Sequence, residues 1–343
     1  MTATTASAVP SVNRQFTLAA RPVGMPKESD FKLVEAPIPA LAAGQVLLRT
    51  QFLSVDPYMR GRMTGVRTYA DPVDIGQVMV GATVGQVVQS TNPNFRVGDS
   101  VAGYWGWQEF SVSDGKGLQK LDPAIAPVST ALGVLGMPGM TAYFGFLEIC
   151  QPKPGETVVV SGAAGAVGSL VGQIAKIKGC RAVGIAGTDE KCAWLTGEVG
   201  FDAAFNYKTT ENLLVKLKEL CPNGIDCYFD NVGGPITDAV MPLLNVFARI
   251  SICGQISQYN AVKPELGVRP FIFMLGKQVR AEGFIVSRWM NRTAEGVAQM
   301  AQWIKEGKLK YREDVIHGFE NAPRALIGVL QGDNTGKMLV AMP

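Results

Sequence analysis

Histidine is nearly absent from this sequence, and its cysteines are scattered. The single histidine is His317, and the six cysteines stand at positions 150, 180, 192, 221, 227 and 253 without close pairing. A zinc site needs several cysteine or histidine ligands at short spacings, so the sequence predicts no metal centre and argues against a zinc-dependent alcohol dehydrogenase. Scattered cysteines also favour reduced thiols in a cytoplasmic protein over the disulfide framework of a secreted one.

Net charge is low as well, at +3. This value is too small to indicate nucleic-acid binding or attachment to an anionic membrane. Met1 to Pro10 lacks the basic start and apolar run of a signal peptide, and we expect a disordered tail there. Thr157 to Ala175 carries no charge, but its four glycines and two serines argue against a membrane span.

The length of 343 residues predicts about two domains. Gln15 to Gln108 is rich in short apolar runs separated by proline and glycine, which predicts a β-rich, barrel-like domain. The expected strands of this part are Phe16–Leu18, Phe31–Val34, Gln45–Leu53, Thr83–Val88 and Asp99–Tyr104. Ala131 to Cys150 predicts a helix that Gly136 to Gly139 interrupts.

Thr157 to Lys178 predicts the first strand, turn and helix of a dinucleotide-binding unit. Val158 to Val160 is a β-branched run typical of a buried parallel strand, and apolar residues recur at helical spacing from Val167. Between them, glycines allow a pyrophosphate to approach the backbone at the positive end of the helix. Ala163 occupies the first position of the usual G-x-G-x-x-G pattern, so the motif alone is weak.

Predicted strands and helices then alternate, which indicates a parallel sheet with right-handed crossovers. The further strands are expected at Arg181–Ala186, Ala203–Asn206, Asp226–Asp230, Phe247–Ile252 and Gln278–Phe284, and the helices at Asp189–Val199, Glu211–Cys221, Pro235–Asn245 and Ala294–Glu306. Six strands in this order predict an α/β, doubly wound Rossmann domain. Val315–Phe319 and Lys337–Val340 resemble strands that return to the first domain.

Gly187 and Thr188 follow the second strand, at the position where an NAD-binding unit carries an acidic residue for the adenosine ribose. Lys191 lies just beyond it, and Tyr207 follows the third strand. A cation and a hydroxyl donor suit a 2′-phosphate, so we expect NADPH. Asp189 and Glu190 nearby keep NADH possible.

Without a metal, an α,β-unsaturated carbonyl is an easier hydride acceptor than a simple ketone, because one or two hydrogen-bond donors stabilise the enolate. Tyr259 lies seven residues after the fifth strand, at the sheet edge where ligands bind. A phenol, with an ordinary pKa of about 10, donates while neutral at pH 7. Tyr259 and Lys263 also match the Tyr-x-x-x-Lys pattern of short-chain dehydrogenases. Pro264 and the lack of helical periodicity make that match a chance one.

Seven segments resemble the zinc-free medium-chain dehydrogenase/reductases, in particular the prostaglandin and alkenal double-bond reductases, which include bacterial curcumin reductase. The matching segments are Val55–Arg60, Gly136–Tyr143, Gly162–Lys176, Gly200–Thr209, Tyr228–Gly234, Ile252–Asn260 and Gly332–Lys337. The resemblance implies a GroES-like substrate domain from residues 1–136 with 313–343, an NADP-binding Rossmann domain from 137–312, and a homodimer.

The resemblance also implies roles for individual residues. Tyr259 would be catalytic, and Tyr58 and Met137 would bind substrate. The implied cofactor-binding residues are Gly165, Ala166, Val167, Gly168, Lys191, Tyr207, Asn231, Cys253, Gly254, Ser257, Tyr259, Phe284, Ile285, Val286 and Asn334.

Taken together, the sequence predicts an NADPH-dependent reductase of the carbon–carbon double bond of enals and enones. The hydride goes to the β-carbon, and Tyr259 stabilises the enolate. A quinone oxidoreductase of the same fold is the first alternative, since quinones also accept hydride without a metal. A non-catalytic NADPH-binding protein is the second, although the modest charge weighs against RNA as its partner.

Overall fold

The computed structural model describes residues 10–343, which form two compact units. Unit 1 comprises the described chain up to Leu132, with Val315–Val329 and Leu339–Pro343; unit 2 comprises Gly133–Asp314 and Leu330–Met338. The expected domains were residues 1–136 with 313–343, and residues 137–312. The observed units differ from them chiefly because Leu330–Met338 belongs to unit 2. The tail expected at Met1 to Pro10 lies, apart from Pro10, outside the described residues.

Unit 1 is β-rich, as predicted. β1 (Val12–Leu18) and β2 (Phe31–Pro37) pair antiparallel, and a second sheet has the order β14-β15-β3-β4-β5-β7, with β6 pairing β3. The strands of the second sheet are β3 (Val46–Ser54), β4 (Thr83–Ser90), β5 (Ser100–Gly103), β6 (Phe110–Ser113), β7 (Gln119–Leu121), β14 (Glu313–His317) and β15 (Lys337–Ala341). The sequence analysis missed β6 and β7, which are only four and three residues long.

The α-helices of this part of the chain are α1 (Tyr58–Arg62) and α9 (Ala322–Gln331), alongside short 3-10 helices. β15 returns to unit 1, where Leu339–Ala341 pairs antiparallel with β3. The pairing agrees with the expectation that the last strand joins the first domain.

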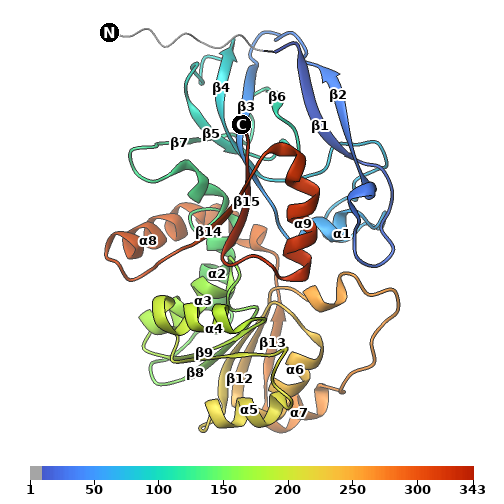
Figure 1. Cartoon of the computed structure of the whole chain (residues 1–343). Coiled ribbons are helices and arrows are strands. Elements are labelled where there is room, and N and C mark those ends of the chain that lie inside the picture. Colours follow the sequence, from blue (N-terminus) through green and yellow to red (C-terminus); the bar gives the residue numbers. More distant parts are fainter. Residues whose placement is uncertain (1–9) are drawn as a thin grey trace. The chain divides into compact units, whose positions relative to one another are not determined.

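Unit 2 is a doubly wound Rossmann sheet, which confirms the predicted fold class. Its six strands are all parallel in the order β10-β9-β8-β11-β12-β13. Figure 1 labels four of them, β8, β9, β12 and β13. The six strands are β8 (Thr157–Ser161), β9 (Arg181–Ala186), β10 (Ala203–Asn206), β11 (Ile225–Asp230), β12 (Leu244–Ile252) and β13 (Arg280–Gly283). Chain order therefore reverses between β8 and β11, where such sheets bind ligands at their carboxyl edge.

Helices cover both faces of this sheet, and alternate side chains of one strand pack against each set. Val158 and Val160 of β8 pack in one core with α2 (Met137–Leu147), α3 (Gly168–Ile177) and α8 (Thr293–Lys305). Val159 packs in a second core with α5 (Leu213–Leu220), α6 (Gly234–Val240) and α7 (Phe271–Lys277). Successive side chains of a strand point to opposite faces, so a run of valines serves both cores.

Three local predictions need correction. Gly136–Gly139 does not interrupt a helix: Val128–Leu132 forms a 3-10 helix, and α2 begins at Met137 with Pro138 in its first turn, where proline is favoured. The helix expected at Pro235–Asn245 ends at Val240, and β12 begins earlier than predicted, at Leu244. α7 was missed, because its apolar run shows no amphipathic period.

The helix expected over Asp189–Val199 is α4 (Asp189–Trp194), followed by one π-helical turn over Leu195–Val199. No helix within residues 10–343 is both long and apolar enough to cross a membrane.

Candidate functional site

The turn between β8 and α3 is built for close approach of a ligand to the backbone. Gly162 has a φ of 58°, and a Cβ on Gly168 would lie 2.4 Å from the Gly162 oxygen and 2.8 Å from Ala163 Cα. Only glycine fits such a turn. Within residues 10–343, the structure records no acceptor for the N–H groups of Val167 and Gly168. Free N–H groups at the start of a ten-residue helix favour an anion.

The C-terminal segment Leu330–Met338 lies against this turn. Gly336 forms a parallel bridge with Gly165 and donates its N–H to the Ala164 oxygen at 2.8 Å. The side-chain amide of Asn334 donates to the Gly336 oxygen at 2.7 Å. Asn334, one of the predicted cofactor residues, therefore sits beside the glycine turn that contains Gly165 to Gly168.

The same segment also contacts Lys191, another of the predicted cofactor residues. Lys191 on α4 is only 8% exposed, and its ammonium donates to the Gly332 oxygen. Burial, followed by the positive charge of Lys208, lowers the pKa of Lys191. Tyr207 is partly exposed, and its ring lies 3.3 Å from the position of a Cβ on Gly187. The structure thus brings Lys191 and Tyr207 to the carboxyl end of β9, where the sequence analysis expected them.

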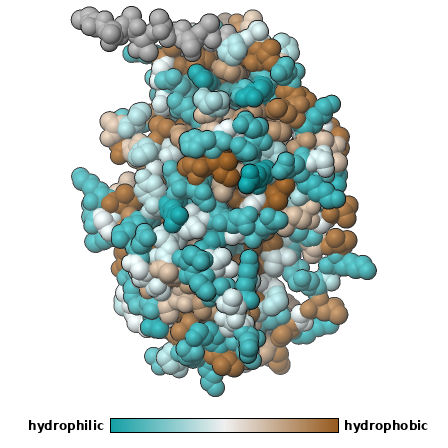
Figure 2. Space-filling model, in the orientation of Figure 1, coloured by the Kyte–Doolittle hydropathy of each residue, from teal (hydrophilic) through white to brown (hydrophobic). Residues whose placement is uncertain are grey.

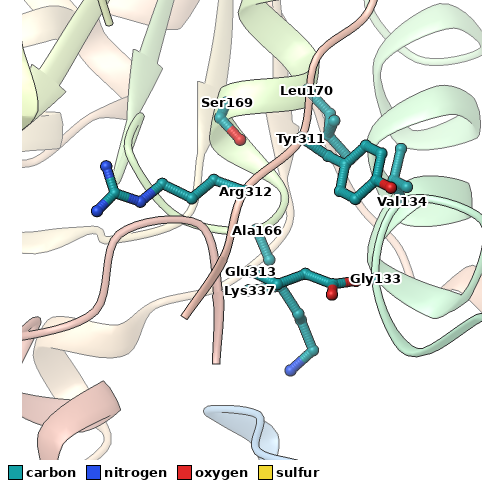
Figure 3. A pocket seen from close by; sticks show the side chains of 9 residues that line it. All are labelled: Gly133, Val134, Ala166, Ser169, Leu170, Tyr311, Arg312, Glu313 and Lys337. Carbon is teal, nitrogen blue, oxygen red and sulfur yellow. The ribbon is translucent and has the colours of Figure 1, made fainter. Parts of the chain in front are cut away.

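A small pocket opens beside the glycine turn. Figure 3 shows its lining residues Gly133, Val134, Ala166, Ser169, Leu170, Tyr311, Arg312, Glu313 and Lys337. Ala166 is the only predicted site residue among them. The pocket therefore adjoins the predicted pyrophosphate turn and does not coincide with the residues expected around the nicotinamide.

Asp230, at the carboxyl end of β11, organises the next two loops. It is 1% exposed, and six donors surround its carboxylate. The Ser161 and Tyr228 hydroxyls and the N–H groups of Val232 and Gly233 donate to Oδ1, while the Thr237 hydroxyl and the Gln255 amide donate to Oδ2, all at 2.8–3.0 Å. One buried carboxylate therefore joins β8, the loop after β11 and the loop after β12.

The neighbouring residue Asn231 is held at the same edge. Its backbone N–H donates to the Ser161 hydroxyl at 2.9 Å, and its side-chain amide donates to the Ser161 oxygen at 2.7 Å. These two bonds fix Asn231 next to the end of the central strand β8, in the position expected for a cofactor-binding residue at the switch point.

The loop from Cys253 to Tyr259 is held by hydrogen bonds to Asp230 and Val232. The N–H groups of Cys253 and Gly254 donate to the backbone carbonyl oxygen of Asp230 at 2.9 and 3.1 Å, and the Ser257 hydroxyl donates to the carbonyl oxygen of Val232 at 2.7 Å. Burial, followed by the charge of Asp230, raises the pKa of Cys253 to about 12, so its thiol stays neutral at physiological pH.

The Tyr259 hydroxyl folds back onto the start of its own loop. The N–H of Gln255 donates to the Tyr259 hydroxyl oxygen at 3.4 Å, and a Cβ on Gly254 would lie 3.2 Å from that oxygen. Since accepting a hydrogen bond strengthens a hydroxyl as a donor, this contact favours the role expected of the phenol.

Phe284, Ile285 and Val286 follow β13. The Phe284 ring points into the core, where it contacts Phe229 and Trp289 at centroid distances of 6.3 and 5.5 Å. The backbone of the segment follows the carboxyl end of β13, and its contact with the nicotinamide stays a prediction.

The two predicted substrate residues lie in different units. Met137 is the first residue of α2 in unit 2, and the Thr141 hydroxyl donates to its carbonyl oxygen at 2.8 Å. Tyr58 begins α1 in unit 1, where burial and the charge of Asp56 raise its pKa, so the phenol is neutral. Tyr69 and Tyr104 also interact electrostatically with Tyr58.

Sequence reasoning missed two charged residues of the site. Asp230 lay within a quoted motif without a role, although a carboxylate ending an apolar strand is a usable signal. Lys208, which lies beside Gly187 and Tyr207, was likewise quoted within the Gly200–Thr209 segment without a role. Among the described residues, no group of three or more His, Cys, Asp or Glu side chains is arranged to hold a metal ion.

Two family profiles match the chain. Residues 14–121 match the N-terminal domain of oxidoreductases, and residues 166–306 match the zinc-binding dehydrogenases. The first match lies within unit 1 and the second within unit 2.

Full-length relatives are also found. The chain is 49% identical to the NADPH-dependent curcumin reductase of Escherichia coli, over 96% of each chain. It is 48% identical to prostaglandin reductase 1 of Rattus norvegicus, over 95% of this chain and 98% of the relative. Among solved structures, that of CurA from Vibrio vulnificus in complex with NADPH superposes with a TM-score of 0.93 at 49% identity, covering 96% of this chain and 99% of the other.

Proposed function

The chain belongs to the medium-chain dehydrogenase/reductase family, and from that membership we propose that it reduces the carbon–carbon double bond of α,β-unsaturated aldehydes and ketones with NADPH. The proposal depends most on one observation: the chain shares almost half of its residues, over nearly its whole length, with an NADPH-dependent curcumin reductase. The geometry of unit 2 supports it independently.

The residues fit NADPH. The turn at Gly165–Gly168 has no space for a side chain at Gly168 and offers free N–H groups to a pyrophosphate. Lys191 and Tyr207 suit a 2′-phosphate at the end of β9. The nicotinamide half is assigned to Asn231, Cys253, Gly254, Ser257, Tyr259, Phe284, Ile285, Val286 and Asn334.

NADPH supplies the hydride when bound, and the protein supplies orientation and a hydrogen-bond donor. Hydride at the β-carbon would leave negative charge on the carbonyl oxygen of the substrate, and a proton from water at the α-carbon would complete the saturated product. The Tyr259 hydroxyl donates to that oxygen and lowers the energy of the enolate. The N–H of Gln255, which donates to the same hydroxyl, polarises it further. Tyr58 and Met137 contact the substrate in this proposal.

Initial rates of NADPH oxidation test the reaction. An enal such as 2-nonenal and an enone such as curcumin should be reduced at least tenfold faster than the matched saturated carbonyl compounds. Faster turnover of a benzoquinone than of either would instead favour a quinone oxidoreductase. No turnover with any acceptor, despite NADPH binding, would favour a non-catalytic role.

A homodimer formed through α7 and β13 is part of the proposal. β13 is an edge strand of the sheet, and α7, directly before it, exposes Phe271, Ile272 and Leu275 at 67–77%. Its opposite face, Phe273 and Met274, packs in the core. A helix that is apolar all round is normally covered, and a second copy would cover it and pair the strand edge. Figure 2 shows hydrophobic residues at the lower right, the side on which Figure 1 draws α7.

Light scattering on the full chain tests the dimer. Leu275→Asp should convert it to a monomer, while Val215→Asp, an exposed apolar position on α5, should leave the assembly unchanged. A monomeric wild type would refute this part of the proposal.

We also propose a cytoplasmic location, consistent with six free cysteines.

A further inference from the structure

Gly187, the residue after β9, leaves room that two other side chains fill. A Cβ on Gly187 would lie 3.3 Å from Cε1 of Tyr207, 3.4 Å from Cε of Lys208 and 3.7 Å from Nζ of Lys208. The Lys208 ammonium therefore lies over the carboxyl end of β9, beside the Tyr207 ring. An acidic side chain at position 187, as NAD-binding units carry, would occupy this space.

Lys208 brings a second positive charge close to Lys191. The two ammonium groups repel each other strongly enough to contribute to the lowered pKa of Lys191. Among the described residues, neither lysine has a carboxylate within salt-bridge distance. Asp333 and Asp314 act on Lys191 electrostatically but form no salt bridge with it. Two neighbouring cations without a salt-bridge partner are arranged for an anion from outside the chain.

Asn206 holds Lys208 in this place. Its side-chain oxygen accepts the N–H of Lys208 at 3.0 Å, and its side-chain amide donates to Asp189 at 3.0 Å. The N–H of Tyr207 donates to the Ala186 oxygen at 3.0 Å. The buried Asn206 thus ties the turn that carries Lys208 to α4, the helix that carries Lys191, and it engages the carboxylate of Asp189.

We propose that Lys208 is a second cationic ligand of the adenosine 2′-phosphate, acting with Lys191 and Tyr207, and that it contributes to the selection of NADPH over NADH. The inference rests on the proposed use of NADPH. A phosphate dianion placed between the two ammonium groups replaces their repulsion with two attractions. The buried Lys191 fixes the position of the phosphate, and the exposed Lys208 neutralises its outer oxygens.

Calorimetric titration of the full chain with 2′,5′-ADP and with 5′-AMP tests the proposal, because the two probes differ only in the 2′-phosphate. Lys208→Ala should weaken binding of 2′,5′-ADP by about tenfold, the typical loss of one charge-assisted contact, and change binding of 5′-AMP by less than about twofold. Lys208→Arg should retain most of the affinity. Lys178→Ala, which removes an exposed lysine at the far end of α3, should have no effect.

Each other outcome counts against the proposal. Equal weakening of both probes by Lys208→Ala would assign the residue a structural role, and unchanged binding of 2′,5′-ADP would assign it none. A wild type that binds both probes equally would overturn the NADPH proposal as well. A wild type that prefers 2′,5′-ADP, combined with an inert Lys208→Ala, would refute Lys208 alone.

Discussion

The Asp230→Asn variant tests the idea that one buried carboxylate positions the loops of the active site. The substituted amide keeps an oxygen for the four donors at Oδ1 and turns its NH₂ group toward Thr237 and Gln255. The Thr237 hydroxyl can rotate and accept, but the Gln255 amide must flip or lose its bond. A hydrogen bond to a charged group contributes roughly 1.5–3 kcal/mol, so we expect a loss of about 2–4 kcal/mol in the free energy of unfolding.

This loss of about 2–4 kcal/mol predicts a fall in melting temperature of roughly 4–16 °C, given about 2–4 °C per kcal/mol for a domain of this size. Gln255 precedes Tyr259 in its loop and donates to the Tyr259 hydroxyl, so kcat for an enone should fall by more than about tenfold. Binding of 2′,5′-ADP should be retained, because β9 and β10 carry that site and do not contact Asp230.

Asp226→Asn is the matched control at the opposite end of β11. Asp226 accepts from the Thr157 N–H and the Asn245 amide, both at 2.8 Å, far along the strand from the loops of the site. It should lose stability while kcat changes by less than about twofold. If Asp230→Asn lowered the melting temperature but left kcat unchanged, the positioning role would be wrong. If neither changed, the hydrogen-bond reasoning itself would be wrong.

Three further predictions concern the cofactor and the phenol. Tyr259→Phe should lower kcat for an enone by about 10²–10³, as loss of one oxyanion donor does, with NADPH affinity intact; a fully active variant would exclude the enolate role. Gly168→Ala should weaken NADPH binding, since its Cβ meets backbone at 2.4 Å, whereas Gly197→Ala, with nothing within 4 Å, should bind normally in the same titration. The pKa of Lys191 is lowered, so as the pH rises this lysine loses its positive charge at a pH below the ordinary lysine pKa of about 10.4. At lower pH, where the side chain is charged, the buried ammonium group destabilises the folded state. The preference for NADPH over NADH should therefore decline with rising pH before an ordinary lysine titrates, and a flat profile up to that value would contradict the shift.

Local patterns predicted the Rossmann unit well. The bounds of β9 and β10 agree with the sequence to the residue, because apolar β-branched or aromatic runs there are bounded by charged or turn residues. The proposed phosphate-binding lysine, Lys191, was located from the end of β9 alone, without contact information. The positions of Lys191 and Tyr207 could therefore be expected in advance.

What the sequence could not show depends on contacts between distant residues. Nothing local indicates that Gly336 pairs with Gly165, or that the Gly332 oxygen accepts from Lys191. The sequence analysis accordingly placed the whole tail in the other domain. Likewise, the six donors around Asp230 come from β8, from β11 itself and from the segments after β11 and β12, so the importance of this carboxylate appears only once the strands are assembled.

The site of hydride delivery tests the central claim most directly. An enone such as 4-phenyl-3-buten-2-one is reduced with NADPH carrying deuterium at the transferable position, and the product is examined by NMR. The account predicts a saturated ketone with deuterium on the β-carbon. Deuterium on the carbonyl carbon of an allylic alcohol would contradict it.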